Sequence, residues 1–277
     1  MKFPMRARFF LAGAIAGSLT AVPVSAEAAP PGNDDIRAAT TVTSAPVAFL
    51  VDTRGATASP SDGPCVAGAS VWYRVRPTAT QTMRVVTLGS NYDTVLAVFS
   101  GPRNARTLLK CRDDTNFGLF SAVQLRFAAG QTYWVAVSAC CGDRRHGRDL
   151  DLRIYPPATS SVTTAVDKVV AGDVSGRLTV SGTTTCGLRA AAFVNIRASQ
   201  RVGDGVARAF SGAEIPVCTS PGQAWTATFD SETAVAFREG RVYLTVHTDA
   251  SDGISAAGHD LNAPFTVELD PNGRRVR

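Results

Sequence analysis

Acidic side chains in two turns of this chain have the chemistry that a calcium ion needs. Asp93 stands in the turn sequence Asn-Tyr-Asp-Thr at 91–94, and Asp113 and Asp114 directly follow Cys111 and Arg112. Calcium is held by oxygen ligands that turns can gather. Short aspartates also close turns by accepting hydrogen bonds from their own backbone. Calcium binding and turn closure therefore stay open as alternatives, and no ligand loop of the EF-hand type accompanies the three residues.

Two adjacent aromatic pairs, Trp72-Tyr73 and Tyr133-Trp134, are the candidate binding residues of the first half. Neighbouring residues of a strand point to opposite faces, so one member of each pair should face the core. Tyr73 alternates with valines and Trp72 with arginines, which favours Trp72 as the outward residue. We expect Trp72 and Trp134 to provide a binding surface, because exposed aromatics anchor partners and sugars. The alternative is that Trp72 fills an interface or a crevice.

Catalytic motifs are not found in the sequence. The histidines His146, His247 and His259 lie outside any H-E-x-x-H pattern, and neither a G-x-S-x-G elbow nor a phosphate-binding glycine loop is present. We therefore assign no catalytic residue, predict no cofactor other than calcium, and do not expect an enzyme. A hydrolase whose triad is assembled across loops remains the rival hypothesis, because triads are recognised by geometry and not by order.

Of the six cysteines, four lie in the first half of the chain and two in the second, an even number in each half. Cys186 and Cys218 are expected to pair, and the other four to form two bridges; these four are Cys65, Cys111, Cys140 and Cys141. An even number of cysteines in an exported chain favours disulfides over a metal site. A bond between the adjacent Cys140 and Cys141 would strain the peptide that joins them, and their side chains should point to opposite faces of a strand. We therefore expect each to reach back to Cys65 or Cys111.

Alternating apolar residues predict strands throughout, with no helical periodicity after the first residues. Leu150, Leu152 and Ile154, for example, alternate with charged residues. Pro156-Pro157 and the small polar residues after it read as a stiff connector. The predicted fold is all-β: a jelly-roll-like sandwich over 33–157, a linker over 158–161 and an immunoglobulin-like sandwich over 162–270.

The first residues have the features of a secretory signal peptide over 1–26, in which basic residues precede a short apolar run and a small-residue cleavage site. Its removal lowers the formal charge from +5 to +2. No later stretch is long enough to span a membrane, and no basic stripe favours nucleic acid. We expect a secreted extracellular protein with disordered segments at 27–32 and 271–277.

The segments Asn33-Asp34-Asp35, Val71-Trp72-Tyr73, Tyr92-Asp93-Thr94 and Cys111-Arg112-Asp113-Asp114 together resemble the bacterial pre-peptidase C-terminal type of β-sandwich domain. The resemblance implies an accessory module that binds a polymer or assists a secreted protein. Some collagen-binding relatives hold calcium near the start of the domain, which adds Asn33 and Asp34 as candidate ligands. The glutamates of those calcium sites are missing from this chain.

The second half is similar to a domain family of unknown function from secreted actinobacterial proteins, on Pro216-Val217-Cys218, Ala224-Trp225-Thr226-Ala227 and Gly240-Arg241-Val242-Tyr243. That resemblance implies no activity. The leading hypothesis is a non-catalytic binding or structural module, acting at the cell surface or in the medium on an extracellular polymer or protein. A secreted hydrolase with a loop-built site and a secreted protein-binding inhibitor are the alternatives, and the sequence leaves the oligomeric state open.

Overall fold

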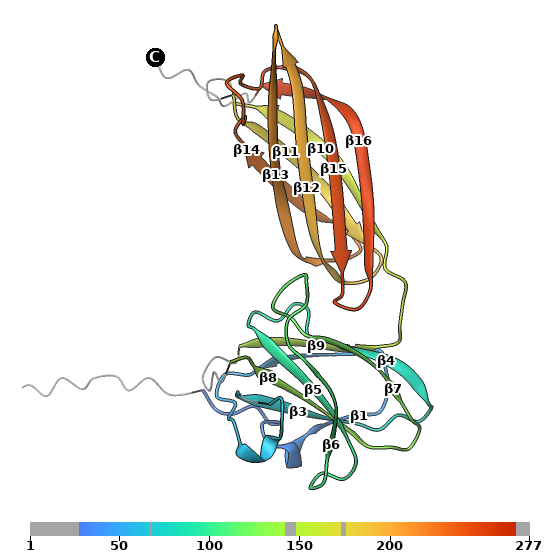
Figure 1. The fold of residues 1–277 in the computed structure, drawn as a ribbon. Coiled ribbons are helices and arrows are strands. Elements are labelled where there is room, and N and C mark those ends of the chain that lie inside the picture. Colours follow the sequence, from blue (N-terminus) through green and yellow to red (C-terminus); the bar gives the residue numbers. More distant parts are fainter. Residues whose placement is uncertain (1–27, 67, 142–147, 173–175, 270–277) are drawn as a thin grey trace, which may run out of the picture.

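The computed structural model describes residues 28–66, 68–141, 148–172 and 176–269. The predicted signal peptide, residue 27, His146 and the predicted tail lie outside the described residues. Among those described, no helix has the length and apolar character that crossing a membrane requires. Two short 3-10 helices, η1 (Ile36–Ala38) and η2 (Pro60–Asp62), accompany sixteen strands in the described part. The all-β class with two sandwiches in tandem is confirmed (Figure 1).

The first sandwich is formed by nine strands of the described residues. They are β1 (Thr40–Val42), β2 (Val47–Asp52), β3 (Ser70–Val75), β4 (Gln81–Val86), β5 (Thr94–Ser100), β6 (Thr107–Arg112), β7 (Ala122–Phe127), β8 (Tyr133–Ala139) and β9 (Asp149–Tyr155). One sheet has the order β1-β3-β8-β5-β6 and the other β2-β9-β4-β7. Alternation places Leu150, Leu152 and Ile154 in the core between the sheets, as the sequence predicts.

The second sandwich begins after residues 156–161 and is formed by seven strands of the described residues. They are β10 (Val162–Ala171), β11 (Leu178–Cys186), β12 (Ala190–Val202), β13 (Gly205–Cys218), β14 (Gln223–Phe229), β15 (Gly240–Ser251) and β16 (Ala256–Leu269). Their order is β13-β12-β15-β16-β10-β11-β14. Strand β16 pairs along its length with β15 and only at its end, in parallel, with β10. The sheet therefore folds into two layers, as in an immunoglobulin-like sandwich.

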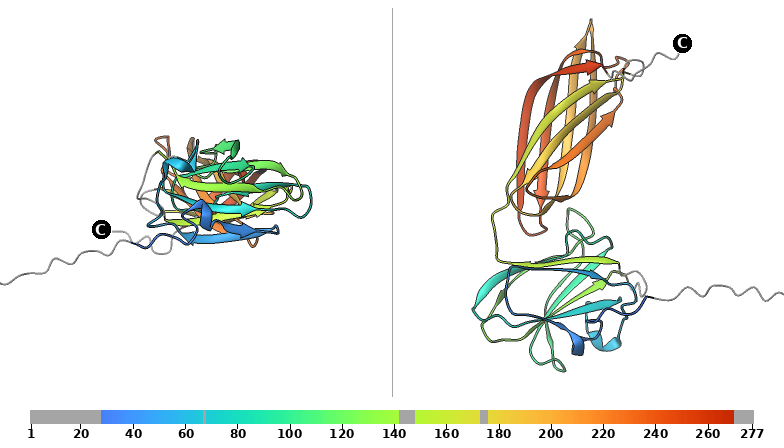
Figure 2. Two further views of the ribbon diagram at one scale, coloured as in Figure 1. Left: turned by 90° about the horizontal axis from the view of Figure 1, so that it is seen from below. Right: turned by 180° about the vertical axis from the view of Figure 1, so that it is seen from behind.

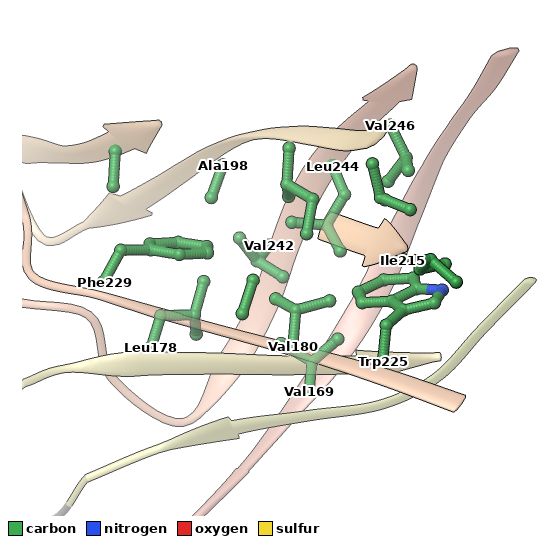
Figure 3. Close-up of a cluster of buried hydrophobic side chains, with 14 of the residues drawn as sticks. Val169, Leu178, Val180, Ala198, Ile215, Trp225, Phe229, Val242, Leu244 and Val246 are labelled. Carbon is green, nitrogen blue, oxygen red and sulfur yellow. The ribbon is translucent and has the colours of Figure 1, made fainter. Parts of the chain in front are cut away.

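One apolar core lies between these two layers (Figure 3). Val180, Trp225 and Leu244 come from β11, β14 and β15 and meet there. The segment after β14 covers the first part of the edge of β13, where Glu232 donates its backbone N–H to the Arg208 carbonyl at 2.7 Å. An occupied edge has no free row of backbone groups to pair with another chain.

The disulfides confirm one pairing and correct another. Cys186 and Cys218 are bonded, as predicted. Cys65 bonds Cys111, and Cys140 bonds Cys141, so the expectation that each of the adjacent cysteines reaches back is wrong. The reason is local: strand β8 ends at Ala139, and Cys141 has a φ of 63°, so strand alternation does not apply to the pair.

Candidate functional site

The turn between β15 and β16 stands on the outer face of the four-stranded sheet of the first sandwich (Figures 1 and 2). At its centre is a buried ion pair: Arg84 Nη1 of β4 donates to Asp252 Oδ2 at 2.7 Å, and the Asp252 side chain is fully buried. Tyr155 donates its hydroxyl to the same oxygen at 3.0 Å. Backbone N–H groups of Ile254 and Ser255 donate to Asp252 Oδ1. The carboxylate therefore has partners from both sandwiches.

A second ionic contact joins the sandwiches beside the first. Arg189 Nη2, just before β12, donates to Asp151 Oδ2 of β9 at 2.6 Å. Arg153 Nε donates to the other oxygen of Asp151 at 2.9 Å. Burial lowers the pKa of Arg189, while the Asp151 carboxylate acts in the opposite direction. Hydrogen bonds between ionised groups, such as these, are stronger than hydrogen bonds between neutral groups.

Apolar residues fill the space around these pairs. Val86, Leu88, Phe120 and Ala122 of the first sandwich form one buried cluster with Ala191 of the second. Phe117 packs on Phe193 with ring centroids 5.9 Å apart. Gly253 lies so close to the first sandwich that a Cβ there would be 2.7 Å from Thr115 and 2.8 Å from Ala122. The two sandwiches thus contact each other through a packed interface as well as through charges.

A groove of about 520 Å³ opens at this junction, and we call it the junction groove. Its lining is mostly apolar and comes from both sandwiches: Leu88, Tyr92, Phe117, Leu119, Phe120, Ala191, Pro216 and Val217, with Asp93 and Glu214 as the acidic members. Leu119 is 59% exposed. Clefts between domains, apolar with a few placed polar groups, are common sites of recognition.

The structure brings three of the five predicted calcium ligands together. One carboxylate oxygen from each of Asp93, Asp113 and Asp114 lies within 4.8 Å of the others. Burial raises the pKa of Asp93, and the charges of Asp114 and then Asp113 raise it further. Burial and the Asp114 charge also raise the pKa of Asp113. Asp93 Oδ1 is buried and has no hydrogen-bond partner among the described residues.

Asn33 and Asp34, the other two predicted ligands, are used elsewhere. Asn33 Nδ2 donates to the Trp72 carbonyl at 3.1 Å. Asp34 accepts hydrogen bonds from the backbone N–H and the hydroxyl of Thr57. Both side chains thus connect the start of the domain to the first sandwich, and the grouped carboxylates of the described residues do not include Asp34. Asn33 and Asp34 therefore do not join the other three candidate ligands.

The predicted binding surface of Trp72 and Trp134 is also wrong. Trp72 does lie on the opposite face from Tyr73, but its side chain is 0% exposed, and that of Trp134 is 6% exposed. The segments around η1 and η2 cover this outer face with Ile36 and Cys65. The Arg106 guanidinium lies 5.1 Å from the Trp72 ring centre. The alternative, that Trp72 fills a covered crevice, describes what is found.

Of the two histidines that the structure describes, His247 is the one with carboxylate neighbours. Its Nδ1 lies 2.7 Å from Asp260 and its Nε2 3.1 Å from Asp249, on an exposed strand face. The hydrogen bond to Asp260 is the main reason that its pKa is raised. His259 Nδ1 accepts a backbone hydrogen bond from Thr164. Neither of these two histidines lines the junction groove.

Sequence reasoning missed the residues that join the sandwiches, Arg84, Asp151, Arg189 and Asp252. Each is a single charged residue with no motif around it, and Arg84 and Asp252 are 168 positions apart. The one signal is Asp252-Gly253 between two alternating strands, which marks a hairpin turn. That signal predicts the turn but not the surface that it contacts.

No protein-family model and no curated protein matches the chain. Among solved structures, the chain is similar to a β-glucuronidase from Ruminococcus gnavus, with 12% identity, a TM-score of 0.22, and coverage of 72% of this chain and 35% of that one. It is also similar to a GH2 β-galacturonidase from Eisenbergiella tayi, with 8% identity, a TM-score of 0.23, and coverage of 71% and 35%. The chain thus spans about a third of these proteins, and a likeness at this level is uninformative about activity or ligand.

Proposed function

We propose that this protein is a secreted, non-catalytic binding module whose two sandwiches act as one body and hold an extracellular partner in the junction groove. The observation that carries the proposal is that both sandwiches line this groove. The buried pair of Arg84 and Asp252 fixes their relative position. Three disulfides in the described residues suit an oxidising compartment and support export.

The partner that fits the groove is a protein segment with an apolar side chain next to a lysine or arginine. Leu119 and Phe117 offer an apolar surface, and Asp93 and Glu214 stand on the same lining. Asp113 and Asp114 add negative charge beside Asp93. An apolar anchor with complementary charge around it is the usual composition of a binding site.

A pull-down of the mature protein against cell wall, chitin, collagen and culture supernatant tests the proposal. We expect retention by collagen or by the proteins of the supernatant, with Leu119→Ala weakening it and Leu50→Ala leaving it unchanged. Leu50 is a matched control because it is also an exposed leucine, at 77%, and lies outside the groove. Retention by neither protein source, or equal retention of the two variants, would overturn the proposal.

A further inference from the structure

The outward face of the second sandwich carries exposed aromatic and arginine side chains on three neighbouring strands. In β12, Ile196 and Ala198 point into the core, while Arg197 and Ser199 point outward. The register places Arg197 between Phe210 of β13 and Thr245 of β15. The next outward row places Ser199 between Arg208 and Tyr243. We call these two rows the arginine-aromatic face.

A hollow of about 360 Å³ lies on this face, a volume typical of a small-ligand site. Phe210 and Tyr243, 51% and 49% exposed, both line it, and the small Ser199 stands on the strand between them. Their strands are separated by β12 and are therefore about 10 Å apart. The Arg197 guanidinium lies 5.8 Å from the centre of the Phe210 ring, so the room for a ligand ring is beside Tyr243, over the small Ser199.

Positive charge surrounds the hollow. Arg197 and Arg208 line it, and Arg201 and Arg241 follow on the same face, two positions beyond Ser199 and Tyr243. Within the described part of the chain, no ion pair joins any of these four to a carboxylate. Glu232 is the acidic residue of the lining, and its Oε1 already accepts the Phe210 backbone N–H at 3.2 Å. The hollow therefore presents guanidinium groups to an incoming anion.

We propose that the arginine-aromatic face binds an acidic polysaccharide, a polymer of sugar rings that carry carboxylates. The apolar C–H face of a ring would stack on Tyr243. Arg197 and Arg208 would each hold a carboxylate in the forked geometry that guanidinium favours. Ser199 and Thr245 supply hydroxyls for the sugar hydroxyl groups. This site adds to the proposed function and does not depend on the junction groove.

The hydroxyls of Ser199 and Thr245 favour a hydroxyl-rich sugar polymer over single-stranded nucleic acid, although stacking and arginines would suit both. Along β15, the outward row after Thr245 contains His247, which is paired with Asp260, and the row after that contains Asp249. A long polyanion of either kind that ran along β15 would meet these carboxylates. The segment that binds is therefore one short enough to stay on the hollow and the arginines.

Affinity gel electrophoresis of the mature protein tests the proposal, with polygalacturonate in the gel as the acidic probe and pullulan as the neutral one. We expect polygalacturonate alone to retard the protein, and added salt to weaken the retardation. Tyr243→Ala and Arg208→Gln should each weaken binding about tenfold, as for anchors of a binding site. Arg126→Gln is the matched control, an exposed strand arginine of the first sandwich.

Three results would overturn the proposal: no retardation at low salt, equal retardation of Tyr243→Ala and the parent protein, or equal affinity for polyglutamate or single-stranded DNA. Because these residues are exposed, unchanged thermal unfolding of each variant is expected and separates lost binding from lost folding. Leu119→Ala should bind polygalacturonate normally. If polygalacturonate does not retard the protein but the pull-down still depends on Leu119, this inference is wrong and the proposed function is kept. If polygalacturonate retards the protein but the pull-down does not depend on Leu119, the proposed function is wrong and this inference is kept.

Discussion

At the scale of single residues, the carboxylates of Asp93, Asp113 and Asp114 repel one another. Because the pKa values of Asp93 and Asp113 are raised on folding, the cluster contributes stability below their ordinary value near 3.8. That contribution is lost as the pH rises through the raised values. Near neutral pH the three negative charges therefore disfavour the folded state, and a bound cation would relieve this.

Replacing Asp113 by Asn should stabilise the protein near neutral pH in the presence of a chelator, because it removes one of three like charges. The melting temperature at pH 7 and at pH 3 is the measurement, with a rise expected only at pH 7. Calcium should raise the melting temperature of the parent protein more than that of Asp113→Asn. If calcium does not change the melting temperature of the parent protein, the role of the cluster is turn closure.

His247 provides a second prediction at this scale. Its pKa is raised above 6.5 chiefly by Asp260, so its contribution to stability is complete below 6.5 and is lost as the pH rises through the higher value. Titration followed by NMR should show a pKa that falls toward 6.5 in Asp260→Asn. A smaller fall is expected in Asp249→Asn, because Asp249 contributes less. Equal values in all three proteins would contradict the assignment.

At the scale of elements, each sandwich has its own covalent bridge between segments that are distant in sequence. Cys186 ends β11 and Cys218 ends β13, so their bond closes a loop across the second sandwich. Replacing both cysteines by Ala should lower the free energy of unfolding of the second sandwich by about 3 to 4 kcal/mol in the chain-entropy model. Urea unfolding followed by Trp225 fluorescence in a Trp72→Phe/Trp134→Phe background is the measurement. A Cys65→Ala/Cys111→Ala variant should leave that transition unchanged.

The β15–β16 turn allows a sharper test of the contact between the sandwiches. Gly253 has a φ of +85°, and a Cβ there would lie 2.7 and 2.8 Å from side chains of the first sandwich. Gly130 also has a positive φ, +73°, but has nothing within 4 Å. In both alanine variants, backbone strain should lower the free energy of unfolding by about 1 to 3 kcal/mol. Gly253→Ala should lower it further than Gly130→Ala, because its Cβ also meets the first sandwich. Equal losses in thermal unfolding would argue against the tight contact.

At the scale of the whole molecule, a short linker, a buried ion pair, a second ionic contact and a packed apolar interface join the two sandwiches. Arg84→Ala leaves Asp252 buried without its cation, which typically costs about 3 to 5 kcal/mol. We expect the sandwiches to separate while each stays folded, seen as a larger maximum dimension in small-angle X-ray scattering. Arg54→Ala breaks an exposed pair with Asp52 and should leave the dimension unchanged. An unchanged dimension in Arg84→Ala would show that apolar packing alone suffices.

Local sequence patterns predict the strands and both sandwiches, because alternation such as Leu150, Leu152 and Ile154 depends only on which face is buried. They also predict that Trp72 and Tyr73 face opposite ways. They do not predict that the segments around η1 and η2 cover Trp72, or that Asp93 meets Asp113, because both depend on how distant segments pack. The same limit applies to Arg84 and Asp252, whose partners are known only once the sandwiches are in contact.

The contact between Arg84 and Asp252 can form only after the second sandwich has been synthesised. The surface of Arg84, Val86, Leu88 and Phe120 emerges early in synthesis, whereas the turn that covers it follows β15. During synthesis, the first sandwich therefore exposes an apolar, cationic patch until the second sandwich has folded. A fragment cut at 158–161 would keep that patch uncovered permanently and should self-associate.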